Sequence, residues 1–272
     1  MHNVRYLILL SALTFLSGCS LIQGGKLYSP ELFGLTRIAA DVYIEQDADD
    51  VRKVALTDAV IKARNAIKLA YGDIHAHPKI SACITEECFW KFGGRGEFAK
   101  VYGTLVLLSP RALNWHFIAH EWSHAEMITR LNLSAWKRMP QWFDEGLAVA
   151  ISEAPEHSED HWQYLVMTDT PRPMPEELHT LKSLDQWLSA VQRYSDNKNA
   201  ERKAHGEPEI HSVYAASGHE IRPWLATAGT PGLLAFIEKL NHGETFESAY
   251  EAADSTVHVA PRQLAQHPKV GP

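Results

Sequence analysis

Cysteine, clustered positive charge and long apolar runs are all scarce in this chain of 272 residues. It has three cysteines, its formal net charge is −7, and no run of Lys or Arg stands out. A chain without a basic run lacks the electrostatic signature of a nucleic-acid-binding protein, so we expect no nucleic-acid partner. No long repeat is visible, which argues against a repeat array. The length and the 45% hydrophobic content suit one substantial domain with a core.

The N-terminus carries an apolar run, Tyr6 to Leu16, which is too short to span a bilayer and follows Arg5 as in a signal peptide. The run ends in Leu16-Ser17-Gly18-Cys19, which resembles the lipobox of bacterial lipoproteins. The resemblance implies cleavage before Cys19 and a lipid anchor on that residue, in the bacterial cell envelope. Ser20 favours the outer membrane, facing the periplasm. The alternative is an ordinary secretory signal that leaves Cys19 free.

Lipid on Cys19 would leave two cysteines, Cys83 and Cys88, as a pair. In an oxidising periplasm their spacing allows a disulfide that closes a tight loop. Zinc binding is the alternative, but two thiolates without a neighbouring histidine or cysteine supply only half of a site. We therefore expect the disulfide.

The chain divides into four predicted parts: signal peptide 1–18, tether 19–45, domain 46–254 and C-terminal tail 255–272. Glycines 24 and 25 and Pro30 indicate the tether, because they break regular structure. Apolar periodicity predicts helices over 48–71, 111–131, 140–153, 181–191, 214–228, 231–241 and 246–253, and β-forming composition predicts strands over 80–84 and 101–108. The stretches 154–180 and 194–209 are expected to be loops, the second of them an exposed loop or lid.

The pentapeptide His120-Glu121-Trp122-Ser123-His124 has the form H-E-x-x-H. On a helix its two histidines stand on one face, one turn apart, close enough to share an ion. Glu121 then points at a metal-bound water, whose pKa zinc lowers towards about 7, and can take its proton. The chain has 15 histidines, so the pentapeptide alone is weak evidence.

A glutamate on the following helix makes the evidence stronger. Glu145 follows His124 by 21 positions, enough chain to end one helix, turn, and start another at Pro140. Glu145 would then face the two histidines, and Gly146 would let the second helix pack closely beside the first. Two histidines and a glutamate with one open position make a catalytic zinc arrangement.

The HEWSH segment and the pattern Pro140-x-Trp142-x-x-Glu145-Gly146-x-Ala148 resemble the gluzincin branch of zinc peptidases. This branch includes thermolysin-like and aminopeptidase-like enzymes and peptidase-MA-like bacterial proteins. A weaker likeness continues through Tyr214–Tyr250, so that the whole covers about Leu105 to Ala253. The resemblance implies Zn²⁺ as the cofactor and an α+β, zincin-like fold, mostly helical, with a small sheet preceding the HExxH helix.

By this resemblance His120, His124 and Glu145 are the metal ligands and Glu121 is the catalytic base. A tyrosine that opens a helix, Tyr214, is the candidate catalytic donor to the oxyanion. A role in packing is the alternative for Tyr214, and the neighbours that can replace it in catalysis are His211, His219 and Arg222.

Two further expectations concern residues around the metal. Asp144 can orient a ligand histidine, although its place near a helix start suits the helix dipole equally well. Thr104–Leu108 can form the edge strand along which a peptide substrate lies, or an interior strand.

We expect zinc-dependent hydrolysis of peptide bonds in a peptide or protein substrate, by a chain attached to the membrane through Cys19. One alternative is a zincin-like binding or scaffold lipoprotein without turnover, against which the intact Glu121 argues. The other is a zinc hydrolase that acts on a non-peptide amide of the cell wall. The substrate, the choice between endo- and exopeptidase and the oligomeric state cannot be read from the residues.

Overall fold

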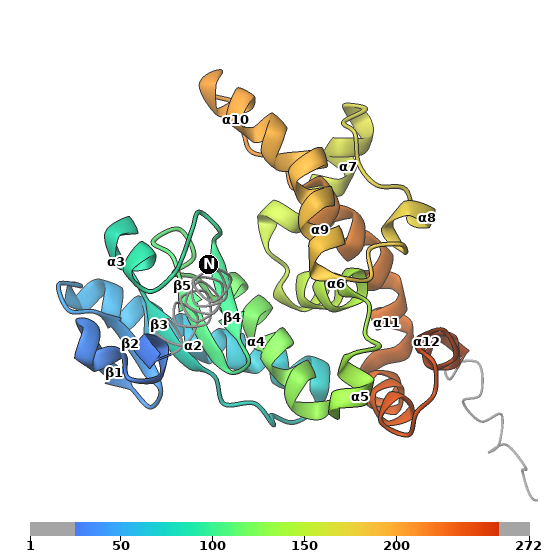
Figure 1. Ribbon diagram of the computed structural model, residues 1–272, viewed down its shortest axis with the longest axis horizontal. Coiled ribbons are helices and arrows are strands. Elements are labelled where there is room, and N and C mark those ends of the chain that lie inside the picture. The colour runs from blue at the N-terminus through green and yellow to red at the C-terminus, as the bar shows by residue number, and fades with distance from the viewer. Residues whose placement is uncertain (1–24, 256–272) are drawn as a thin grey trace, which may run out of the picture.

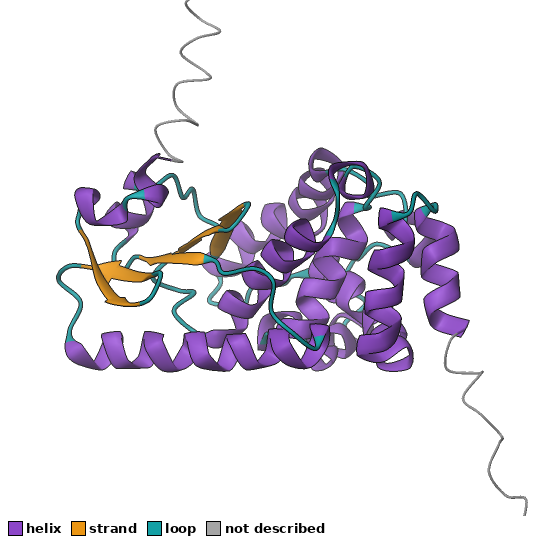
Figure 2. Ribbon diagram, turned by 90° about the horizontal axis from the view of Figure 1, so that it is seen from below, coloured by secondary structure: helices purple, strands orange, loops and turns teal. Residues whose placement is uncertain are grey.

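The computed structural model describes residues 25–255. The predicted signal peptide 1–18, the lipidation site Cys19 and tail residues 256–272 lie outside this range. Within it the protein is mostly helical, with one small mixed sheet. The sheet lies at one end of the molecule and helices alone make up the other end (Figure 1), while the long helix α2 (Asp50–Tyr71) runs from beneath the sheet towards the helical end (Figure 2). An α+β fold, mostly helical with a small sheet, was predicted, and the structure has this composition.

The sheet has five strands in the order β1-β2-β3-β5-β4. The strands are β1 (Leu35–Ala39), β2 (Val42–Glu45), β3 (Lys79–Ala82), β4 (Ala99–Tyr102) and β5 (Leu105–Leu108). The pairs β2–β3 and β3–β5 are parallel, whereas β1–β2 and β4–β5 are antiparallel. Two hairpins therefore flank a parallel centre.

The tether predicted over 19–45 is wrong where the structure describes it. Residues 25–28 are helical, Pro30–Phe33 form the 3₁₀ helix η1, and β1 and β2 follow directly. Leu27, Leu35 and Ile44 are buried, so this stretch is part of the folded domain. Strands of four and five residues are too short to show a clear alternation beside the glycine and proline that precede them.

The single strand predicted over 101–108 is also wrong, because it is a hairpin. Gly103 has a φ of 64°, a left-handed conformation that glycine adopts without strain, and it turns the chain between β4 and β5. The expectation that Thr104–Leu108 is an interior strand holds for β5, which lies between β3 and β4. The edge strand is β4.

Alternate residues of the central strands pack on opposite faces of the sheet. Ile44, Ala82 and Val106 belong to the main core, which they share with helix α2 (Asp50–Tyr71) and helix α4 (Trp115–Arg130). Tyr43 and Leu107 instead belong to a second core, beneath helix α3 (Glu86–Lys91). Because side chains alternate along a strand, this pattern places α2 and α3 on opposite faces of the sheet (Figure 2).

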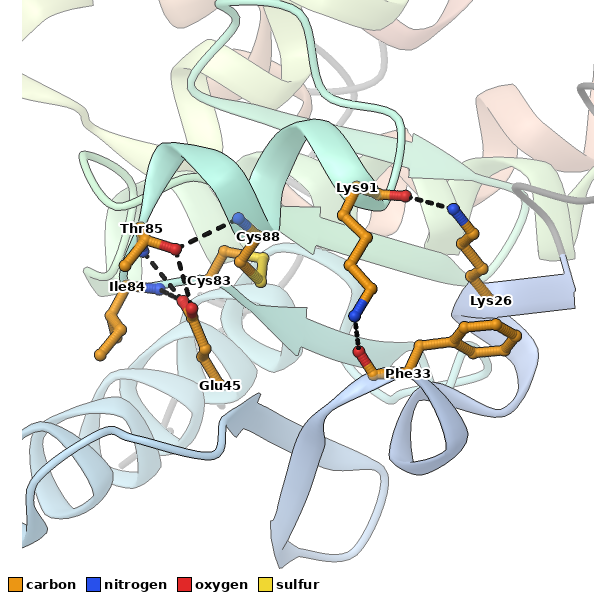
Figure 3. Close-up of a disulfide and its surroundings, with 8 residues drawn as sticks. All are labelled: Lys26, Phe33, Glu45, Cys83, Ile84, Thr85, Cys88 and Lys91. Atoms are coloured by element: carbon orange, nitrogen blue, oxygen red, sulfur yellow. Dashed lines mark hydrogen bonds between the residues drawn. A yellow bond between two sulfur atoms is a disulfide. The ribbon is translucent and has the colours of Figure 1, made fainter.

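The disulfide connects the sheet to α3. Cys83, directly after β3, is bonded to Cys88 in α3, with 5.5 Å between their Cα atoms (Figure 3). The Glu45 carboxylate lies beside the pair but accepts hydrogen bonds from the backbone of Ile84 and from the backbone and hydroxyl of Thr85. With both sulfurs bonded and the carboxylate in use, these residues do not offer the zinc site that was the alternative to the disulfide.

The helical end is built around α6 (Gln141–Ser152), which packs against both α4 and α11 (Ser212–Asn241). Two helices were predicted over 214–228 and 231–241, and α11 spans both, with a kink at Gly229 (φ 58°) just before Pro231. Helix α12 (Phe246–Ser255) packs against α11. The connection between α4 and α6 contains the short helix α5 (Leu133–Trp136).

The two predicted loops contain helices. The stretch 154–180 holds η2 (Pro155–His157), α7 (Glu159–Met167) and α8 (Pro175–Leu178), because two of its prolines open helices instead of breaking them. After α9 (Leu184–Val191), the chain continues through the π-helical turn η3 (Gln192–Asp196) into α10 (Asn197–Ala204). Helix α10 projects from the body (Figure 1), and its residues are exposed or half-buried, so it shows no apolar periodicity. Within residues 25–255 no helix is long and apolar enough to cross a membrane.

Candidate metal centre

The two histidines of the HEWSH segment lie one above the other on α4. Their Nε2 atoms are 3.2 Å apart, and both side chains are buried. Helix α4 begins cleanly because the side chain of Asn114 accepts hydrogen bonds from the backbone of His116 and Phe117. The spacing of four residues then brings both imidazoles to one face.

Glu145 comes to the same point from α6. Its Oε2 atom lies 3.3 Å from Nε2 of His120 and 3.7 Å from Nε2 of His124. Its Oε1 atom accepts a hydrogen bond of 3.0 Å from the side chain of Gln141. Oε2 is buried and has no hydrogen-bond partner among the residues that the structure describes. An unpartnered carboxylate oxygen that faces two imidazole nitrogens suits a cation between them.

The three donor atoms lie within 4.8 Å of one another, so His120, His124 and Glu145 can hold a metal ion. Two imidazoles and one carboxylate are a donor set that zinc accepts, and three protein ligands leave a coordination position open. The residues present therefore fit a metal ion.

Asp144 lies behind one of these histidines. Its Oδ2 atom is 2.8 Å from Nδ1 of His124, and both side chains are buried. This contact leaves Nε2 of His124 turned towards Glu145 and His120. Of the two roles considered for Asp144, the geometry supports orientation of a ligand.

The charge states of Glu145 and His124 depend strongly on the charged groups around them. Burial opposes the charged form of Glu145, but the two histidines outweigh it and hold the pKa of Glu145 below its usual value. Burial likewise lowers the pKa of His124, and the carboxylates of Asp144 and Glu145 reverse this and raise it well above the usual value. The site is therefore built to concentrate negative charge around whatever cation occupies it.

Gly146 allows a close helix contact, but not the one that was predicted. A Cβ atom at this position would come within 2.5 Å of the Ser217 hydroxyl and 2.8 Å of the Ser217 carbonyl, both on α11. The glycine therefore fits α6 against α11, not against α4. The Ser217 hydroxyl also donates a hydrogen bond of 2.5 Å to the carbonyl of Trp142, which fixes the start of α6.

The chain that connects the two ligand-bearing helices is clamped to the end of α11. The backbone N–H of Asn132 donates to the side chain of Asn241, and its side chain donates to the Asn241 carbonyl, at 2.8 and 2.9 Å. The Arg138 guanidinium donates to the carbonyl of Leu240. Both ends of α5 are thus held by the same helix terminus.

A cleft of about 520 Å³ opens beside His120, the one of the three candidate ligands that lines it. One wall is the segment before and at the start of β4, and the other is formed by α9, η3 and the start of α11. Side chains from both walls line it: Arg95, Glu97, Phe98, Leu188, Asp196 and His211. The cleft reaches His120 and Glu121, so a substrate in it can approach the centre.

Glu121 lines this cleft next to His120. Burial raises its pKa, the nearby imidazoles of His120 and His124 lower it, and the Glu145 carboxylate raises it again, with a net upward shift. A carboxylate with a raised pKa is a better proton acceptor at neutral pH than an exposed one. The position and environment of Glu121 suit a general base.

Tyr214 also lines the cleft, from the first turn of α11. Its ring centroid is 6.3 Å from that of His120, and Trp187 packs edge-on against it. Burial, followed by the nearby Glu145 carboxylate, raises the pKa of Tyr214 far above its usual value, so the phenol keeps its proton. Tyr214 thus packs in the core and faces the cleft at the same time.

The three residues considered as alternatives to Tyr214 lie in different places. His211 lines the cleft. His219 and Arg222 lie beside Glu159, at 2.9 and 3.6 Å from its carboxylate. Only His211 of the three is therefore placed to reach a substrate in the cleft.

His157 also lines the cleft, from η2, although it was not among the predicted site residues. Its ring stacks on Tyr214 with 4.7 Å between centroids, and its centroid is 6.4 Å from that of His120. Its Nδ1 atom is buried and has no hydrogen-bond partner within the described part of the chain. Burial, with His211, His120 and His161 nearby, lowers the pKa of His157 well below its usual value, so the ring is neutral. No pattern marked this residue in the stretch 154–180.

Comparison with known proteins gives no relative: no family model, no curated protein and no solved structure matches the chain. Fold and site alone therefore define its class. It is a mostly helical α+β protein with a buried centre of two histidines and one glutamate, able to bind a metal ion at the side of a cleft.

Proposed function

We propose that the protein is a zincin-like zinc metallopeptidase of the gluzincin type. His120, His124 and Glu145 hold the zinc ion, and Glu121 acts as the base. The observation that carries the proposal is the buried, unpartnered Oε2 atom of Glu145 opposite the two Nε2 atoms, beside a cleft that also contains a second buried carboxylate.

Each residue of the centre has one task in this reaction. Zinc, when bound, supplies Lewis acidity, which acidifies water and polarises a carbonyl group. Glu121 accepts a proton from the attacking water and delivers it to the leaving amine. Asp144 keeps the ring of His124 in the orientation that presents Nε2.

Two neutral donors face the developing negative charge on the substrate carbonyl. The phenol of Tyr214 keeps its proton, and the neutral ring of His157 can carry a proton on its unpartnered Nδ1 atom. Because the two rings stack, they present their donors from the same wall of the cleft. Such preorganised donors stabilise a tetrahedral oxyanion.

An extended peptide fits this cleft better than a compact substrate. The edge strand β4 borders the cleft through its first residue, Ala99, next to Phe98, and an edge strand offers backbone groups to which a peptide can pair. We therefore propose a peptide or protein substrate that lies along β4, with its scissile bond near His120 and Glu121.

We further propose that the chain is a lipoprotein, anchored through Cys19 and located at the outer membrane on its periplasmic side. The support is the Leu-Ser-Gly-Cys motif after the apolar run and the serine that follows it. The disulfide between Cys83 and Cys88 agrees with an oxidising compartment.

The test is to measure zinc content and peptide hydrolysis together in the wild type, in Glu121→Gln and in the matched control Glu209→Gln, which changes another carboxylate that lines the cleft. We expect zinc in all three proteins. Hydrolysis should fall by about 10²–10⁴-fold in Glu121→Gln alone. Bound zinc without hydrolysis of any peptide in a diverse library would contradict the peptidase and favour a scaffold, or a hydrolase of another amide.

A further inference from the structure

The segment 25–33 and helix α3 form one outer layer, which we call the N-terminal layer. The Lys26 side chain donates a hydrogen bond of 2.6 Å to the Lys91 carbonyl, and the Lys91 side chain donates one of 2.7 Å to the Phe33 carbonyl (Figure 3). Beneath these contacts, Leu27 and Phe89 are fully buried against the sheet. The layer covers the face of the sheet opposite α2 (Figure 2).

This layer exposes three large apolar or amphipathic side chains, although its other apolar residues are buried or, in Phe33, partly buried. Tyr28 is 71% exposed, Leu32 is 80% exposed and Trp90 is 60% exposed. Trp and Tyr are enriched where proteins meet the interface between membrane and water, because their rings combine an apolar body with a polar group. Leu32 adds a side chain that gains from insertion into lipid.

The position of the layer in the chain suggests what covers it. Gly25, where the layer begins, is six residues after Cys19. Six residues span about 20 Å at most, at roughly 3.3–3.6 Å per residue. A lipid on Cys19 would therefore hold this layer, before any other part of the fold, within reach of the bilayer surface.

The charged side chains of the layer do not favour binding to an anionic membrane. They nearly balance, two positive against three negative: Lys26, Lys91, Glu31, Glu86 and Glu87. Both lysine side chains are also engaged by backbone carbonyls of the layer. Contact with a membrane would therefore depend on the apolar and aromatic side chains and should change little with salt.

We propose that the N-terminal layer rests on the phospholipid bilayer, with Tyr28, Leu32 and Trp90 inserted at its interface. The lipid supplies a tether and the layer supplies the second, weaker contact, so that the domain lies on the membrane in a defined orientation. The proposal rests on lipidation of Cys19 and is independent of peptide hydrolysis.

The test uses the lipidated full-length product purified from bacteria and placed in vesicles of phosphatidylethanolamine and phosphatidylglycerol with brominated acyl chains. Bromine quenches tryptophans that lie at the membrane. We expect partial quenching in the wild type. The quenched component should be absent from Trp90→Phe and present in the matched control Trp162→Phe, a tryptophan of α7 at the helical end.

A second pair of variants keeps Trp90 as the reporter. Tyr28→Ser/Leu32→Ser should reduce the quenching of Trp90 at both low and high salt. Val51→Ser/Val54→Ser, which changes two exposed residues of α2 on the opposite side of the sheet, should leave it unchanged. All four positions are exposed, so the variants should fold, which circular dichroism can check.

Equal quenching in the wild type and Trp90→Phe would overturn the proposal, as would an intact mass without lipid on Cys19. Oligomers that form through Tyr28 and Leu32 without lipid quenching would assign the layer to a second copy of the chain instead. Hydrolysis of a soluble peptide by Tyr28→Ser/Leu32→Ser should equal that of the wild type, so a failure of the peptidase proposal is seen separately.

Discussion

Asp144 and His124 lie 2.8 Å apart, carboxylate oxygen to Nδ1, in a buried pair that connects α6 to α4. This contact joins the two helices that carry the candidate ligands. It also determines which nitrogen of His124 is free. A residue that never touches the metal can therefore control how well the metal is held.

Replacement of Asp144 by Asn should weaken zinc binding by about 10–100-fold, since the amide carries no charge to match the imidazole. Competition with a chelator measures the change in zinc affinity. Asp169→Asn, in a turn at the far end of α7, is the control and should keep wild-type affinity. An unchanged affinity in Asp144→Asn would show that the contact does not orient the ligand.

Replacement of Gly146 by Ala should destabilise the protein by about 1–3 kcal/mol, because the added methyl group overlaps α11. Urea unfolding measures the free energy change. Zinc affinity should fall as well, since any shift of α6 moves Glu145. Gly25→Ala is the matched control, because no atom lies within 4 Å of its Cβ position. If both variants unfold alike, the close contact is not a constraint.

Replacement of Glu126 by Ala should cost about 3–5 kcal/mol. This fully buried carboxylate accepts hydrogen bonds from the backbone of His75 and Ala76, at 2.7 and 2.6 Å, and forms an ion pair with Arg130. Without this carboxylate, the two backbone N–H groups and the largely buried guanidinium of Arg130 lose their partner. Urea unfolding is the measurement. Glu31→Ala, at an exposed position, should change the stability by less than about 0.5 kcal/mol.

The metal-free protein should lose stability as the pH falls from about 6.5 towards 4. Burial, then the positive charges of His161 and Arg111, lower the pKa of His211 from 6.5 to about 4. The unfolded chain then binds a proton that the folded chain refuses, so stability is present above pH 6.5 and is lost as the pH falls through this window. The shift corresponds to about 3 kcal/mol at most.

The measurement is urea unfolding of the wild type and of His211→Gln between pH 7.5 and pH 4. The groups facing His211 include Glu209, whose carboxylate lies 3.9 Å from Nε2, and the rings of His157 and His161. His211→Gln should show a smaller loss of stability over this range. An equal loss in both proteins would assign the pH dependence to other groups.

The core of the candidate site could be predicted because it depends on local rules. The spacing of His120 and His124 on one helix face and the turn of the chain before Glu145 both follow from helix geometry. Helices α2, α4, α6 and α9 also lie near their predicted bounds, since each carries a regular apolar stripe.

The rest depends on contacts between distant parts of the chain. His157 belongs to the cleft only because α7 and α11 fold back over η2, and nothing in its neighbouring residues signals that. Gly146 was predicted to ease a contact, but the partner helix was wrong, since sequence does not reveal which face of α6 meets α11. The strands β1 and β2 were not predicted, because strands this short show little alternation of apolar and polar residues, whereas the nearby proline and two glycines indicate irregular structure.

The clamp between Asn132 and Asn241 has a consequence for kinetics. The connection between α4 and α6 cannot move away from the end of α11 unless these hydrogen bonds break, so the three donor atoms should keep their places in the metal-free protein. A metal ion would then reach the centre through the cleft and bind at a site that is already formed, without a prior change in the fold. Association should therefore be fast and single-phased, and Asn132→Ala/Asn241→Ala, which removes both hydrogen bonds of the clamp, should add a slow phase.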